Sequence, residues 1–174
     1  VANVVYLVNP NNPTGKLLAV DEIEKLLKTY PDTLFIVDEA YYEFAKQSSC
    51  HLVVSHKNLI VTRTFSKAFG LASVRLGYCM AHPDTLLHLR KIRNGKAVNS
   101  LAQLCGVAAL DDLNYLDSLI DEMNDAKKFF VDNLPHEYYA VDSQTNFVLL
   151  KTPDSKKLLN KMKDNKTVSY THLT

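Results

Sequence analysis

The chain has 174 residues, of which 47% are hydrophobic and 22% are charged, and its formal net charge is +1. This composition is typical of a globular domain with enough apolar side chains to form a core. A charge so close to zero gives no electrostatic reason to expect nucleic acid or an anionic membrane as a partner, and no apolar run approaches the roughly 18 residues that a membrane span needs.

The three cysteines and six histidines do not have the spacing of a metal site, so we predict no metal cofactor. An odd number of widely separated cysteines without a CxxC pair predicts reduced thiols and a cytoplasmic protein. Cys79 and Cys105 are flanked by apolar residues, and we expect both to be small side chains of the core.

Apolar runs and helical spacing alternate over the first half of the chain. A helix is predicted over Val20–Tyr30, where apolar side chains fall on one face and charged side chains on the other. Four continuous apolar runs are predicted to be strands: Val4–Val8, Leu34–Val37, Leu59–Val61 and Leu76–Ala81. Because continuous apolar strands are buried on both faces, we expect a mostly parallel sheet in a protein of the α/β class.

Helical patterns dominate the second half. The helices are predicted at Pro83–Arg93, Ser100–Asp111, Leu113–Leu134 and Ser155–Lys163. Two strands, Tyr138–Val141 and Asn146–Leu150, are predicted between the third helix and the last. A long helix followed by a strand–strand–helix unit indicates passage into a smaller domain, so we assign residues 1–134 to a large domain with its connecting helix and residues 135–167 to the start of a small one. The chain lacks an initial Met and stops without completing a unit. We therefore expect an incomplete chain, and hypothesise that residues 168–174 are foreign or frame-shifted sequence.

Three polar clusters follow the predicted strands. They are the turn-forming Asn9–Gly15, the acidic Asp38–Tyr41 and Thr64–Gly70, which contains Lys67. In α/β sheets, ligands bind at the carboxyl ends of the strands. We therefore expect the three clusters to meet at one site.

Lys67 is the first candidate for chemistry, because a lysine amine can form a Schiff base with a carbonyl. A lysine in a polar loop is usually only solvated, but Lys67 follows a buried strand and precedes Ala-Phe-Gly. Thr64 and Ser66 flank it, and hydroxyls near a helix start can bind a phosphate or cap the helix. Arg75 lies eight residues after Lys67 and can grip phosphate oxygens bidentately, the alternative being an ion pair with a helix carboxylate.

Asp38 ends a predicted buried strand, where a carboxylate must be paired or hydrogen-bonded. The segment Asp38-Glu39-Ala40-Tyr41 can also be interpreted as an ordinary turn into a helix.

Together, these three clusters and Arg75 resemble the large domain of the fold type I pyridoxal phosphate (PLP) aminotransferases of class I/II, and are most similar to the histidinol-phosphate aminotransferase group. The resemblance covers roughly Val4 to Lys163, which is only part of a family member. It implies an α/β/α sandwich with a mostly parallel sheet as the PLP-binding domain, the start of a smaller α+β domain, and a homodimer whose active sites are shared.

The resemblance also implies a role for each residue of the clusters. Lys67 carries the PLP aldehyde and then acts as the general base, and Asp38 bonds the protonated pyridine nitrogen. Tyr41 and Asn12 bond the ring 3-oxygen, and the Asn12–Pro13 peptide bond is commonly cis in the family. The remaining three residues, which bind the phosphate, are Thr64, Ser66 and Arg75.

The activity implied is that of a PLP-dependent aminotransferase, which moves an amino group between an amine or amino acid such as histidinol phosphate and a 2-oxo acid. Two alternatives use the same motifs: a decarboxylase of the same fold, similar to threonine-phosphate decarboxylase, and a non-catalytic domain of the PLP fold. Loss of the lysine or the aspartate is common in such non-catalytic domains, whereas this chain has both Lys67 and Asp38.

Overall fold

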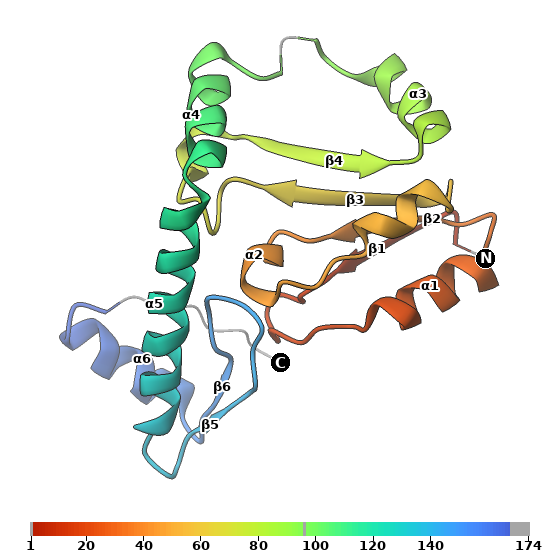
Figure 1. Cartoon of the computed structure of the whole chain (residues 1–174). Coiled ribbons are helices and arrows are strands. Elements are labelled where there is room, and N and C mark those ends of the chain that lie inside the picture. The colour runs from red at the N-terminus through yellow and green to blue at the C-terminus, as the bar shows by residue number, and fades with distance from the viewer. Residues whose placement is uncertain (1, 96, 168–174) are drawn as a thin grey trace.

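The computed structural model of the chain describes residues 2–95 and 97–167. The hypothesis about residues 168–174 falls outside the described residues. Within them, a sheet of four strands and a sheet of two strands are joined by a long helix (Figure 1).

The larger sheet confirms the predicted α/β class and the predicted strands. Its strands are adjacent in chain order, at β1 (Val4–Val8), β2 (Leu34–Asp38), β3 (Leu59–Thr64) and β4 (Gly77–Ala81). β1, β2 and β3 are parallel, and β4 runs antiparallel to β3. The three parallel strands therefore end at the same edge of the sheet, and each continues there into one of the polar clusters.

One face of this sheet is covered by helix α1 (Val20–Thr29) and the 3₁₀ helix η1 (Cys50–Val54). α1 begins where Glu22 accepts a hydrogen bond from the Ala19 backbone N–H at 3.2 Å. Alternation along the strands places their apolar side chains against α1. The buried residues of this core are Ile23, Leu27, Phe35, Val37, Leu52, Leu59 and Val61.

The opposite face of the sheet is more open. Val4 and Tyr6 alternate with the core residues of β1 and are 52% and 57% exposed. β4 is an edge strand, and Tyr78 and Cys79 on it are exposed, so the prediction that Cys79 belongs to the core was wrong. An apolar run in sequence does not reveal that its strand lies at an edge, where neighbours are lacking on one side.

The helices after β4 match the sequence patterns to within two residues. They are α3 (Pro83–Ile92), α4 (Ser100–Asp111) and α5 (Leu113–Asp132). Asn99 and Asp112 cap α4 and α5 by accepting hydrogen bonds from the N–H groups of Ala102 at 2.9 Å and Tyr115 at 3.2 Å. α5 packs its Leu116 and Ile120 against Tyr41 and Ala68, so the long helix supports the loops that follow β2 and β3.

The C-terminal part contains β5 (Tyr139–Ala140), β6 (Leu150–Lys151) and helix α6 (Ser155–Asp164). β5 and β6 are antiparallel and shorter than predicted, because residues 143–147 form a turn of their own. In that turn the Ser143 hydroxyl donates to the Phe147 carbonyl at 2.6 Å, and a side chain that bonds the local backbone competes with strand pairing.

This turn contacts the first half of the chain at Gly15. The Gln144 N–H donates to the Gly15 carbonyl at 2.8 Å, and a Cβ on Gly15 would lie 2.2 Å from the Ser143 Oγ. Gly15 also has a φ of 69°, which favours glycine. From the other side, the Lys127 ammonium of α5 donates to the carbonyls of Ser143 at 3.0 Å and Thr145 at 2.8 Å.

Candidate active site

A pocket of about 460 Å³ lies at the edge of the sheet where the parallel strands end. Residues from the loops after β2 and β3 and from the segment before β4 line it. Five of the residues singled out in the sequence are among them: Asp38, Thr64, Ser66, Lys67 and Arg75. The structure therefore brings together an amine, a guanidinium, a carboxylate and two hydroxyls.

Tyr41 and Asn12 are joined to this pocket through Lys67. The Lys67 Nζ lies 5.5 Å from the centroid of the Tyr41 ring, and the Tyr41 Oη accepts a hydrogen bond from the Asn12 Nδ2 at 3.2 Å. Tyr41 is buried and packs edge-on against Phe147 with the ring centroids 5.2 Å apart. The Asn12–Pro13 peptide bond is cis, as the resemblance implied.

The Asp38 carboxylate is held by two donors, one from the turn after β2 and one from β1. Its Oδ1 accepts from the Ala40 N–H at 3.1 Å, and its Oδ2 accepts from the Tyr6 hydroxyl at 2.5 Å. Donation to Asp38, with some desolvation, raises the pKa of Tyr6 to about 12. Tyr6 did not figure among the predicted site residues. The signal for it is register: Val8 is paired with Asp38, and Tyr6 lies two residues back on the same face of β1.

Residues 65–69, directly after β3, form bends and a turn, whereas the sequence suggested a helix start there. The Thr64 hydroxyl accepts from the Ser66 N–H at 3.1 Å and donates to the Leu76 carbonyl at 3.3 Å. A threonine that bonds the N–H two residues on stabilises such a turn, which explains the difference. The turn also fixes Ser66 beside Lys67 at the mouth of the pocket.

Arg75 is exposed and has a left-handed backbone with a φ of 56°. Its Nη1 donates to the Ala72 carbonyl at 3.1 Å. In the described part of the chain Arg75 has no ion pair with a carboxylate, so the alternative of a helix ion pair does not hold there.

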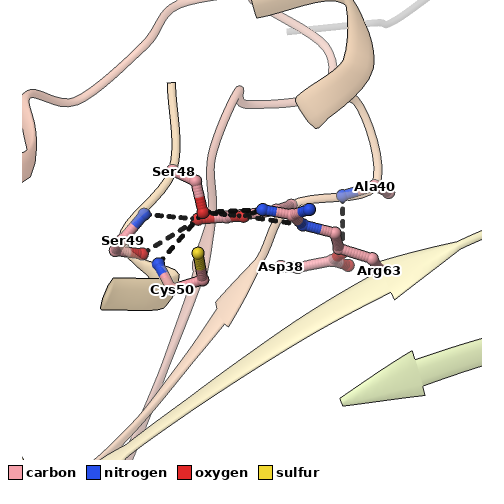
Figure 2. Close-up of polar contacts among 7 residues, drawn as sticks. Asp38, Ala40, Ser48, Ser49, Cys50 and Arg63 are labelled. Carbon is pink, nitrogen blue, oxygen red and sulfur yellow. Dashed lines mark hydrogen bonds and ion pairs between the residues drawn. The ribbon is translucent and has the colours of Figure 1, made fainter. Parts of the chain in front are cut away.

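A second polar cluster lies next to the pocket and was missed in the sequence (Figure 2). Glu39 and Arg63 form an ion pair at 3.0 Å, with side chains that are 1% and 10% exposed. They are the immediate neighbours of Asp38 and Thr64 in the chain. The signal for the pair is again register, since Asp38 is paired with Thr62 and the next residue of each strand faces the same way.

In the described residues, no helix is both long and apolar enough to cross a bilayer. Nor do any three of their His, Cys, Asp or Glu side chains form a group that could hold a metal ion.

The whole chain, residues 1–174, matches the protein family described as aminotransferase class I and II. It is 46% identical over 153 residues to a dihydroxyacetone phosphate transaminase of Campylobacter jejuni, a match that covers 85% of this chain and 42% of that protein. It is 43% identical over 147 residues to a histidinol-phosphate aminotransferase of Methanococcoides burtonii, covering 84% of this chain and 40% of that protein. The chain thus spans less than half the length of these two relatives.

Solved structures with similar folds include enzymes of two reaction types. A histidinol-phosphate aminotransferase from Sinorhizobium meliloti in complex with pyridoxal-5'-phosphate superposes with a TM-score of 0.86 at 28% identity, covering 94% of this chain and 47% of that one. An L-threonine-O-3-phosphate decarboxylase from Porphyromonas gingivalis superposes with a TM-score of 0.81 at 28% identity, covering 93% of this chain and 52% of that one.

Proposed function

Because the chain belongs to the aminotransferase class I and II family, we propose that the whole protein is a PLP-dependent aminotransferase. It moves an amino group between an amine or amino acid, of which histidinol phosphate is the model, and a 2-oxo acid. The observation that carries this proposal is the single pocket in which the amine of Lys67, the carboxylate of Asp38 and the guanidinium of Arg75 converge.

The pocket has the groups that PLP requires. An aldehyde is matched by the Lys67 amine, a phosphate by the Arg75 guanidinium with the hydroxyls of Thr64 and Ser66, and a protonated ring nitrogen by the Asp38 carboxylate. A volume of about 460 Å³ is within the range of small-molecule sites. The donor set therefore fits PLP, which when bound supplies an electron sink for the substrate carbon.

Each residue then has a defined task. The Lys67 amine holds the cofactor aldehyde and, once released, carries the proton to and from the substrate Cα. Asp38 keeps the ring nitrogen protonated, and its orientation is set by Ala40 and Tyr6. Asn12 and Tyr41, already hydrogen-bonded to each other, bind the ring oxygen.

The proposed amino donor is a phosphorylated amine or amino acid, or an aromatic amino acid. The names of the relatives support the phosphorylated class, since dihydroxyacetone phosphate, histidinol phosphate and threonine phosphate all carry a phosphate ester. The fold of the decarboxylase is nearly as similar as that of the aminotransferase, so decarboxylation is retained as the second candidate.

We also propose that residues 1–134 belong to the PLP-binding domain and residues 135–167 to the start of a small domain. A homodimer is supported by the exposed apolar side chains along α4, where Leu101, Leu104 and Val107 are each at least 60% exposed. A cytoplasmic location is supported by the unpaired state of all three cysteines.

The test uses the whole protein and follows the visible absorbance of a lysine–PLP imine. We expect a band that borohydride bleaches, fixing PLP to the protein, and amino transfer to 2-oxoglutarate. Lys67→Ala abolishes both, whereas Lys25→Ala, a change at an exposed lysine of α1, leaves both intact. A reducible band that persists in Lys67→Ala would refute the role of Lys67. Release of carbon dioxide without amino transfer would establish the decarboxylase, and PLP binding with neither product would establish a non-catalytic domain.

A further inference from the structure

Glu39 and Arg63 flank the pocket, which Arg63 also lines, but their side chains leave the strand ends on the face opposite those of Asp38 and Thr64. Side chains alternate between the faces of a strand, so Thr62 and Thr64 project to one side of β3 and Arg63 to the other. The backbone follows the same register, because the Glu39 N–H donates to the Thr62 carbonyl at 2.8 Å. Glu39 therefore directly follows Asp38, and Arg63 lies between Thr62 and Thr64, so both members of the ion pair are bonded in the chain to residues that line the pocket.

Both oxygens of the Glu39 carboxylate accept hydrogen bonds. Oε1 accepts from the N–H of Ser49 at 2.7 Å and from its hydroxyl at 3.0 Å. Oε2 accepts from the hydroxyl of Ser48 at 2.7 Å and from Nε and Nη2 of Arg63 at 3.1 and 3.0 Å. A buried carboxylate with this many donors has one orientation, and that orientation fixes its neighbours.

Arg63 is equally constrained. Besides Glu39, its Nη2 donates to the Ser48 hydroxyl at 2.7 Å, and its guanidinium carbon lies 3.4 Å from the centroid of the Tyr42 ring. Three segments thus meet at this one cation: the turn after β2, the loop at residues 48–49 and the end of β3. The first of these segments carries Asp38 and Tyr41, and the last leads into the turn that carries Lys67.

We propose that Glu39 and Arg63 are positioning residues for the site. Their ion pair holds Asp38 and Tyr41, at the end of β2, at a fixed position relative to Lys67, in the turn after β3. Both ends of a bound ring can then be contacted at once. The proposal deepens the proposed function, on which it rests for the identity of the bound ring. Supporting groups of this kind matter because a misplacement of about 1 Å in a reaction centre can cost roughly 100-fold in rate.

Glu43 provides a matched control. It lies four residues after Glu39, is also buried at 8% exposure, and is close enough to Arg63 to interact with its charge. Its Oε2, however, accepts no hydrogen bond from any group in the described residues. Glu43→Gln therefore removes a buried carboxyl from the same neighbourhood without breaking the network, whereas Glu39→Gln turns a hydrogen-bond acceptor into a donor that faces other donors.

The experiment compares Glu39→Gln, Arg63→Lys and Glu43→Gln in the whole protein. In the cofactor-free state, amide hydrogen exchange is measured at residues 38–41 and 62–67. We expect exchange at both segments to rise at least tenfold in Glu39→Gln and not to rise in Glu43→Gln. Arg63→Lys keeps the charge but loses the planar fork, so a smaller rise at the same two segments is expected, and it decides the matter if Glu39→Gln does not fold.

With PLP bound, the second readout is the pH midpoint of the visible band together with cofactor retention. We expect Glu39→Gln and Arg63→Lys to shift the midpoint and to release PLP about 10- to 100-fold faster than wild type, with Glu43→Gln unchanged. The proposal is overturned if both variants lose thermal stability while exchange rises evenly over the fold and the band and retention stay as in wild type. A wild-type protein that binds no PLP would refute the proposed function alone, because the exchange measurement still tests the pair.

Discussion

The two sides of the strand ends of β2 and β3 differ in how their polar groups are used. On the pocket side, Lys67 and Arg75 are exposed and make few contacts with the protein. On the other side, the Glu39 side chain is buried and that of Arg63 is only 10% exposed, and both use their hydrogen-bonding groups on each other and on Ser48 and Ser49. Residues that are adjacent in the chain thus differ in role: one set is left free to meet a ligand, and the other holds the loops that carry the first set.

The largest effect on stability is expected from Arg63→Ala. Removing one partner of a buried ion pair leaves the other charge uncompensated, so the free energy of unfolding should fall by about 3–5 kcal/mol. Lys67→Ala, at an exposed position in the adjacent loop, should change it by less than about 0.5 kcal/mol. Urea unfolding of both variants checks the contrast, and equal losses would remove the distinction between the two sides.

A large effect on chemistry without a loss of fold, second only to that of Lys67→Ala, is expected from Asp38→Asn. The amide keeps the shape of the carboxylate but not the charge that holds a proton on the ring nitrogen, so the rate of amino transfer should fall roughly 100- to 1,000-fold. Single-turnover kinetics with PLP bound measures this. A variant with wild-type rates would show that the carboxylate is not the group that faces the ring.

A moderate gain in stability is expected from Glu43→Gln. Burial raises the pKa of Glu43, so the neutral carboxyl is the form that the folded state favours. The neutral Glu43 carboxyl therefore stabilises the fold below the unfolded pKa of 4.5, and this stabilisation is lost as the pH rises through the folded pKa. At pH 7 the ionised carboxylate lowers the free energy of unfolding. Glutamine removes that cost, and the gain should be about 1 kcal/mol at pH 7 and smaller at pH 4. Urea midpoints at the two pH values test it, and a loss at pH 7 would contradict it.

The smallest effect is expected from Tyr6→Phe, which removes the hydroxyl that bonds Asp38. Tyr6 is 57% exposed, so solvent screens the bond and its loss should cost no more than about 1 kcal/mol. Its pKa is raised from 10.0 to about 12, so the neutral phenol stabilises the fold fully below pH 10 and this is lost as the pH rises toward 12. The stability difference between wild type and Tyr6→Phe should therefore shrink between pH 10.0 and about pH 12, and a constant difference would exclude the hydrogen bond to Asp38.

Much of this arrangement could be predicted from the sequence because it depends on local chemistry. Continuous apolar runs predicted the four strands, and the polar residues directly after them predicted which side chains would share a pocket. What could not be predicted depends on neighbours that are distant in the chain. The exposure of Cys79 follows from the edge position of β4, and the short β5 and β6 follow from hydroxyl bonds within residues 143–147. Glu39 and Arg63 are 24 residues apart and meet only because β2 and β3 are paired in one register.

Gly15 connects the loop that carries Asn12 to the turn at residues 143–147, and through that turn to α5. The Gly15 carbonyl accepts a hydrogen bond from the Gln144 N–H, and no side chain fits between Gly15 and Ser143. The Lys127 ammonium donates to the Ser143 carbonyl of the same turn. A displacement of α5 would consequently be transmitted through that turn to the loop that carries Asn12, and would redirect the amide that faces Tyr41.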